Sequence, residues 1–256
     1  MASRLARTLS NITPGRVKGA AFRVRKLFWK ATRPDLAITL GHLKRWGYDP
    51  SAIIDVGAYV GEWTEMIRKT FPAAKVLMVE AQESKGPTLR KVCEKHAGRV
   101  VLENTLLGPA DGQAVRFVEM ETGSSVFEEE SPYDRTVVEK TQMTLDTVVA
   151  RHPGFDRATF LKLDVQGYEL EVLKGASRLL QGLEFVLMEA SLIPINRGCP
   201  VVADVCRFMA DRDFPLLDIC SMVRRRDGYL WQTDLLFVNR KSQFLPKPAL
   251  DSSNWV

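Results

Sequence analysis

A buried strand that runs directly into a glycine-containing turn is the feature that most constrains the fold of this chain. The run Ile53–Gly61 begins as an apolar strand and turns through Gly57 and Gly61 into a helix expected over 62–70. Glycine permits a tight bend and lets a small molecule approach the main chain, and the first N–H groups of the following helix are unpaired. The pattern predicts an α/β sheet with a ligand at this turn.

The ligand expected at the turn is a cationic nucleoside. The next apolar strand, over 75–80, ends in Glu80, at a spacing that lets an acid accept the hydroxyls of a ribose. The turn lacks the Gly-x-Gly-x-x-Gly pattern of dinucleotide sites, and Asp55 would repel a phosphate. S-adenosylmethionine fits, because it carries an ammonium and a sulfonium group; alternatively, Asp55 caps the turn and Glu80 is a solvated strand end. The expected cofactor contacts are Asp55, Gly57, Ala58, Tyr59, Gly61, Glu80 and Ala81.

Apolar runs of strand length alternate with amphipathic runs of helix length beyond the first 34 residues. We expect helices at 36–46, 62–70, 84–96, 145–151, 170–180 and 202–212. We expect strands at 52–56, 75–80, 99–106, 114–120, 159–163, 185–189, 216–219 and 235–238. The last two strands flank a polar turn at 224–228 with no helix between them, so they must be antiparallel. The pattern predicts a Rossmann-like α/β fold with a mostly parallel seven-stranded sheet and an antiparallel edge strand, plus an N-terminal helical arm.

Length and composition fit one enzyme-sized domain with appendages. The chain has 256 residues, of which 45% are hydrophobic, and we divide it into an arm (1–34), a body (35–240) and a tail (241–256). No apolar run is long enough to span a bilayer, and the N-terminus lacks the apolar core of a secretory signal. The cysteines form no Cys-x-x-Cys pair and have no histidine partners at zinc spacing, which predicts reduced thiols in the cytoplasm. They are Cys93, Cys199, Cys206 and Cys220.

The positive charge of the chain is concentrated in the arm. Residues 1–34 contain nine Lys or Arg and no acid, which leaves 27 basic and 31 acidic residues in the remainder. Apolar residues recur at helical spacing along one side of the arm, so we expect a basic amphipathic helix. This helix could pack on the body, lie on the inner face of an anionic membrane, or dock a partner. The acidic body argues against nucleic acid as a partner. The apolar residues are Val17, Ala20, Ala21, Val24, Leu27, Phe28 and Ala31.

Two further acids follow apolar strands later in the chain. Asp164 ends the strand over 159–163 before a turn through Gly167, and Glu189 ends the strand over 185–189. Ligands of doubly wound sheets bind at the carboxyl ends of the strands, so both acids should share one rim with Asp55 and Glu80. Four carboxylates there require cations, which a cationic cofactor, a divalent metal at Asp164 or the nearby Lys162 could supply. The alternative is that Asp164 and Glu189 act as caps or loop acceptors.

Four segments of the chain resemble the FkbM family of S-adenosylmethionine-dependent methyltransferases. They are Asp55–Ala58, Gly123–Ser125, Leu161–Ala176 and Thr233–Val238, and the resemblance extends over about residues 50 to 240. The run Asp-Val-Gln-Gly-x-Glu-x-x-Val-Leu-Lys-Gly-Ala within the third segment is specific for that family. The resemblance implies a Rossmann-like fold and O-methylation, commonly of sugar hydroxyls on glycans, glycolipids or natural products.

Methyl transfer is an in-line displacement at carbon, so alignment of the acceptor and exclusion of water should supply most of the catalysis. If a general base acts, Asp164 is the first candidate and Glu189 the second, because the three histidines fall in helices or a loop away from the rim. The candidate acceptor-binding residues are Ser124, Ser125, Gln166 and Arg197. Two other classes of protein stay open: a non-catalytic nucleoside-binding or scaffolding protein, and an NAD-dependent enzyme.

Overall fold

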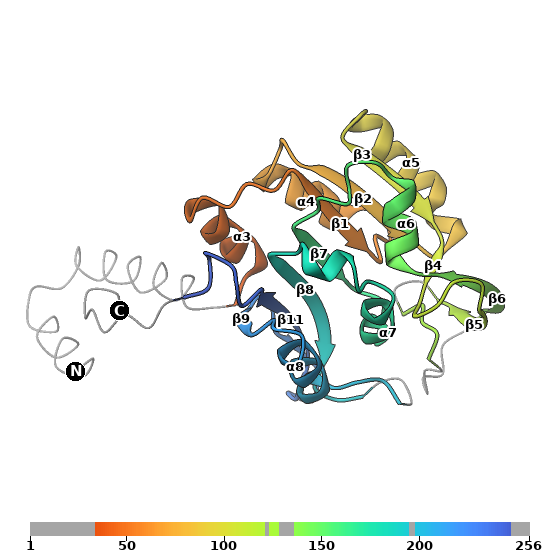
Figure 1. Cartoon of the computed structure of the whole chain (residues 1–256). Helices are drawn as coiled ribbons and strands as arrows, with labels where there is room; N and C mark the ends of the chain where they lie inside the picture. The colour runs from red at the N-terminus through yellow and green to blue at the C-terminus, as the bar shows by residue number, and fades with distance from the viewer. Residues whose placement is uncertain (1–33, 121–122, 128–135, 195–197, 247–256) are drawn as a thin grey trace, which may run out of the picture.

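The computed structural model describes residues 34–120, 123–127, 136–194 and 198–246 (Figure 1). The helix predicted in the N-terminal arm, Arg197 and the end of the tail from residue 247 lie outside these residues. Within the described ranges, no helix has both the length and the apolar character needed to cross a membrane.

One large mixed sheet forms the centre of the molecule, in the order β10-β11-β8-β7-β1-β2-β3, with β9 also pairing with β11. Its five strands from β8 to β3 are parallel, whereas β11 is antiparallel to β8 and to β9. The strands are β1 (Ala52–Val56), β2 (Lys75–Glu80), β3 (Val100–Asn104), β7 (Phe160–Leu163), β8 (Phe185–Ser191), β9 (Leu216–Ile219), β10 (Val223–Arg224) and β11 (Leu230–Val238).

The predicted Rossmann-like fold is confirmed, with two corrections to the sheet. It has eight strands and not seven, because the two-residue strand β10 is too short to leave a periodic pattern. The reversed strand β11 is not at the edge but lies between β8 and β9. Most of β11 is buried, as a central strand requires, whereas Leu216 and Ile219 of β9 are exposed. The predicted antiparallel pairing of these two strands is confirmed.

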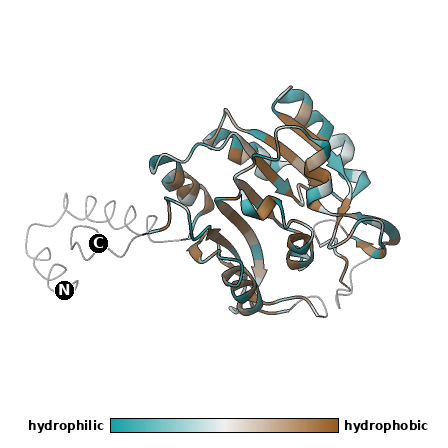
Figure 2. Ribbon diagram, viewed as in Figure 1, coloured by the Kyte–Doolittle hydropathy of each residue, from teal (hydrophilic) through white to brown (hydrophobic). Residues whose placement is uncertain are grey.

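Helices cover both faces of the sheet, and alternate residues of each strand face one layer or the other. Ile53 of β1 belongs to a cluster with side chains of α3, α4 and α5, whereas Ile54 belongs to a cluster with side chains of α6, α7 and α8. Figure 2 shows the resulting hydrophobic strands between helices with more hydrophilic residues. The helices are α3 (Leu36–Arg45), α4 (Glu62–Thr70), α5 (Gly86–Lys95), α6 (Leu145–Arg151), α7 (Glu169–Lys174) and α8 (Val202–Ala210), with 3-10 turns η2 (Glu83–Lys85) and η3 (Leu179–Gln181).

A small second sheet lies beside the carboxyl ends of the main strands. Its order is β4 (Leu106–Leu107), β6 (Thr136–Met143) and β5 (Ala114–Glu119). The extra antiparallel strand predicted over 114–120 is therefore present, but it pairs with β6, which we did not predict. The predicted strand 99–106 divides into β3 and β4 because the chain leaves the main sheet between them.

The turn between β1 and α4 depends on Gly57. Its φ is +73°, and its N–H donates to the Val79 carbonyl across 2.9 Å, which ties the turn to β2. A Cβ at this position would overlap the backbone carbonyl of Asp164. The ends of β1, β2 and β7 can therefore meet this closely only when residue 57 is glycine.

We predict that Gly57→Ala lowers the free energy of unfolding by about 4 kcal/mol, because left-handed strain and a clash with backbone act together. Urea denaturation measures this loss. Gly112→Ala is the matched control: φ is +80°, but nothing lies within 4 Å of the added Cβ, so only about 1 to 2 kcal/mol should be lost. Equal losses for the two variants would contradict the close contact at Gly57.

Candidate active site

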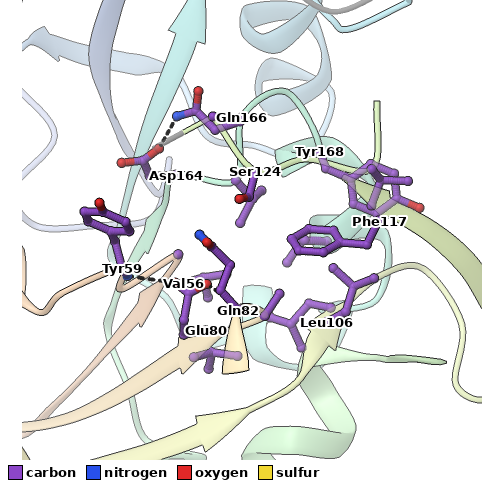
Figure 3. A pocket seen from close by; sticks show the side chains of 18 of the residues that line it. Val56, Tyr59, Glu80, Gln82, Leu106, Phe117, Ser124, Asp164, Gln166 and Tyr168 are labelled. Atoms are coloured by element: carbon purple, nitrogen blue, oxygen red, sulfur yellow. Dashed lines mark hydrogen bonds between the residues drawn. The ribbon is translucent and has the colours of Figure 1, made fainter. Parts of the chain in front are cut away.

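A cavity of about 490 Å³ opens at the carboxyl ends of β1, β2, β7 and β8, next to the small sheet. In Figure 3 Tyr59, Glu80 and Asp164 lie on one side of it, and Phe117 and Tyr168 lie on the other. The polar lining residues include Tyr59, Glu80, Gln82, Thr105, Ser124, Asp164, Gln166, Glu189 and Gln232. The apolar lining residues include Leu106, Leu107, Phe117, Val126, Tyr168 and Val172. The cavity thus has a charged side and an apolar side.

Glu80 joins the turn after β1 to the segment after β2. Its Oε2 accepts the Tyr59 N–H at 2.7 Å, and its Oε1 accepts the Gln82 N–H at 2.8 Å. Burial raises the pKa of Glu80, although the two backbone N–H groups and Lys162 oppose this effect. A carboxylate has about four acceptor positions, so Glu80 keeps capacity to accept from a ligand in the cavity that it lines.

Asp55, which we expected to contact the cofactor, is fully buried and does not line the cavity. Its Oδ2 accepts the Thr64 hydroxyl at 2.7 Å, and its Oδ1 lies 3.1 Å from Lys162 Nζ. A buried carboxylate requires such partners, since an unpaired buried charge is very costly. The structure therefore places Asp55 beneath the turn as a partner of Lys162.

Lys162 connects the ends of β1 and β7. Its ammonium donates to the carbonyls of Val56 at 3.2 Å and Gly57 at 2.8 Å, and it lies 3.7 Å from Asp164 Oδ2. Burial alone would lower the pKa of Lys162, but the carboxylates of Asp55 and Asp164 outweigh it, and the pKa is raised. A charged lysine thus relieves part of the repulsion among the carboxylates on the rim, as the sequence suggested.

Asp164 and Glu189 lie side by side on the rim, bridged by the side-chain amide of Gln166. The Nε2 group of Gln166 donates to Asp164 Oδ1 at 2.8 Å and to Glu189 Oε1 at 3.0 Å. Gln232 Nε2 donates to the same Glu189 oxygen at 2.8 Å. Burial, followed by the charge of Asp164, raises the pKa of Glu189 to about 9. The raised pKa favours the protonated form of Glu189 at neutral pH, because a neutral carboxyl beside Asp164 avoids a second negative charge.

The loop after β7 is built around the buried carboxylate of Glu169. Its Oε1 accepts the N–H groups of Val165 at 2.8 Å and Gly167 at 3.2 Å. Burial raises the pKa of Glu169 to about 7. Gln166 has a φ of 55°, and its carbonyl accepts the Ser125 hydroxyl at 2.9 Å. This loop orients Gln166 across the two rim carboxyls.

The other predicted site residues divide into two groups. Gly57, Tyr59, Ala81 and Ser124 line the cavity with the rim residues already described. Ala58, Gly61 and Ser125 are buried and do not line it. Ser124 exchanges hydrogen bonds with the backbone of Met120. Arg197 is outside the described residues.

The cavity also contains residues that we did not predict. Gln82, Tyr168 and Gln232 line it, as do the apolar residues of the small sheet. Gln82 follows Glu80 by two positions, and Gln232 immediately precedes the Thr233–Val238 segment. Their closeness to these motifs is the only sequence signal that could have predicted them as cavity residues. Nothing in the local sequence indicates that Phe117 reaches the cavity, since it comes from the other sheet.

The structure does not support the divalent metal that the sequence suggested at Asp164. Among the described residues, no group of three His, Cys, Asp or Glu side chains could hold a metal ion. The polar groups next to Asp164 include the Gln166 amide and the Lys162 ammonium, which are donors. A divalent cation would need oxygen ligands in these places.

A family model described as the methyltransferase FkbM domain matches residues 55–216. Among solved structures, the FkbM methyltransferase from Methylobacillus flagellatus KT is 19% identical (TM-score 0.49), with 73% of this chain covering 43% of that one. The magnesium protoporphyrin IX methyltransferase from Synechocystis PCC 6803, solved with bound SAM, is 13% identical (TM-score 0.47; 80% of this chain and 77% of that one). A putative O-methyltransferase from Klebsiella pneumoniae is 11% identical (TM-score 0.46; 79% of each chain). A search of curated proteins found no match.

The raised pKa of Glu189 predicts a pH-dependent stability. The ordinary pKa of this carboxyl, near 4.5, rises to about 9 on folding. The protonated carboxyl therefore stabilises the native state, and this contribution is lost as the pH rises from about 4.5 to about 9. Glu189→Gln should therefore flatten the decline in melting temperature between these limits. Glu94→Gln, on an exposed position of α5, should leave the decline unchanged. Parallel curves for the wild type and Glu189→Gln would contradict a protonated Glu189.

Proposed function

This chain belongs to the FkbM family of methyltransferases, and from that premise we propose that it transfers a methyl group from S-adenosylmethionine to a hydroxyl oxygen. The proposed acceptor is a sugar, glycan, glycolipid or natural product. The observation that carries the proposal is the cavity in which Glu80 and the glycine turn stand beside Asp164 and Glu189. One side of the cavity suits a nucleoside, and the adjoining carboxyls suit a polar acceptor.

In this proposal the cofactor binds at the ends of β1 and β2. Glu80 accepts hydrogen bonds from the ribose hydroxyls, and Gly57 allows the cofactor to approach the backbone of the turn. The Asp164 carboxylate supplies a negative field for the ammonium and sulfonium groups. Asp55 acts indirectly, because its ion pair with Lys162 fixes the carbonyls of Val56 and Gly57.

The proposed chemistry takes place at Asp164. When bound, S-adenosylmethionine would supply an electrophilic methyl group to the acceptor oxygen and would be released as the neutral thioether S-adenosylhomocysteine. The hydroxyl proton passes to the Asp164 carboxylate, whose side chain is 38% exposed and lines the cavity. Gln166 holds Asp164 in position through its 2.8 Å hydrogen bond, so that alignment and base catalysis act together.

The role of Glu80 can be tested by a double-mutant cycle in titration calorimetry. Glu80→Gln should weaken S-adenosylhomocysteine binding by about 1.5 to 3 kcal/mol, the value of hydrogen bonds to a charged group. An analogue without ribose hydroxyls should bind the wild type and Glu80→Gln almost equally, because the contact is already lost. Glu62→Gln, at the exposed start of α4, is the control and should bind both ligands normally. If the loss of affinity from Glu80→Gln and the loss from removing the ribose hydroxyls simply add, the ribose does not contact Glu80.

The role of Asp164 can be tested by steady-state kinetics on an acceptor found by screening saccharides and glycolipids with labelled cofactor. Asp164→Asn should lower kcat about 10²- to 10⁴-fold and leave the Kd of S-adenosylmethionine unchanged. Activity should survive EDTA. A fully active Asp164→Asn enzyme would remove the proposed base. Cofactor binding without methyl transfer to any acceptor would favour the alternative of a non-catalytic nucleoside-binding protein.

A further inference from the structure

The hairpin between β10 and β11 exposes an uninterrupted stretch of chain. Every residue from Met222 to Tyr229 is exposed, including three large side chains that carry apolar surface. The exposed fractions are 48% for Met222, 42% for Val223 and 68% for Tyr229. An exposed apolar side chain is ordinary when it stands alone, but several together indicate an interaction surface.

The same hairpin carries a concentrated positive charge. Arg224, Arg225 and Arg226 are consecutive and exposed, and Asp227 is the single acid between Met222 and Tyr229. Arg225 pairs with Asp227 at 2.6 Å, and Arg224 donates to the Gly228 carbonyl at 3.0 Å. These contacts shape the turn and leave the hairpin with a net charge of +2.

The second strand of the hairpin, β11, carries residues that line the cavity. Trp231 and Gln232, which directly follow the exposed stretch and Leu230, line the cavity. The Leu192 N–H donates to the Trp231 carbonyl at 2.7 Å, and the Leu192 side chain is 40% exposed. Leu192 and Met222–Tyr229 are here called the hairpin surface. This surface is connected through Leu230 and Trp231 to the residues that line the cavity.

We propose that the hairpin surface docks on an anionic phospholipid bilayer. Guanidinium groups bind lipid phosphates, while adjacent aliphatic side chains and a tyrosine enter the boundary between headgroups and acyl chains. The charge fits a nucleic acid as well, but a phosphate backbone would offer Met222 and Val223 no apolar contact. A protein docked in this orientation would present its cavity to an acceptor carried by a membrane lipid, an inference that rests on the proposed function.

Vesicle flotation with the full chain tests this docking without relying on methyl transfer. The vesicles contain phosphatidylcholine alone or an equimolar mixture with phosphatidylglycerol. The triple variant Arg224→Gln, Arg225→Gln, Arg226→Gln should bind the mixed vesicles at least about tenfold more weakly than the wild type. The matched triple variant Lys69→Gln, Lys91→Gln, Arg178→Gln removes three exposed charges elsewhere and should bind normally.

Further variants separate charge, apolar contact and folding. Replacing the three arginines with lysine should preserve most of the binding, and Met222→Ser with Tyr229→Ser should weaken it with all charges retained. Unchanged melting temperatures show that the variants fold. Equal vesicle binding by the wild type and the arginine-to-glutamine variant would overturn the proposal. Equal losses of vesicle binding in that variant and in the Lys69, Lys91 and Arg178 control variant would also overturn it. An arginine dependence seen with a DNA oligomer and not with vesicles would also overturn it.

Discussion

The candidate site depends on the buried ion pair between Lys162 and Asp55. Lys162 Nζ lies 3.1 Å from Asp55 Oδ1 and also donates to the carbonyls of Val56 and Gly57, so one ammonium group joins the ends of β1 and β7. Parallel strands of this kind are held side by side by their ladders, but the ladders end where the turns begin. Asp55 and Lys162 are register partners inside the β1–β7 ladder, and the Lys162 ammonium extends the connection past its last pair, Val56 and Leu163, to the Gly57 carbonyl. Removing either partner would leave a buried charge without compensation, which costs about 3 to 5 kcal/mol.

The ion pair also allows acidic groups to accumulate around the cavity. Lys162 lies 3.7 Å from Asp164, and its charge lowers the pKa of Glu80 and Glu189 against the opposing effect of burial. Protonation of Glu189 removes a further negative charge. The resulting rim can accept hydrogen bonds from a ligand and can attract a cation, but it holds much less repulsion than four ionised carboxylates would. Gln166 completes it by donating to both rim carboxyls.

The sequence predicts the fold well because the signals are local and periodic. The glycine turn, the apolar strands and the acids that end them follow from short segments, and the rule that ligands bind at the carboxyl ends of strands places Glu80 and Asp164 on one rim. Side-chain direction does not follow from such segments. Asp55 points beneath the turn because Lys162, more than 100 residues away, lies on the neighbouring strand. Strand β6 and the apolar side of the cavity depend in the same way on pairing between distant segments.

The central claim is that the cavity at the ends of β1, β2, β7 and β8 binds the methyl donor with its reacting end toward the rim carboxyls. A crystal structure of the full chain with S-adenosylhomocysteine tests it most directly. The account predicts ribose hydroxyls within hydrogen-bond distance of Glu80 and a sulfur atom that faces Asp164 and Glu189, with the Lys162–Asp55 ion pair intact below. A ligand bound elsewhere, or bound here with its ribose away from Glu80 and its sulfur away from both carboxyls, would contradict the account.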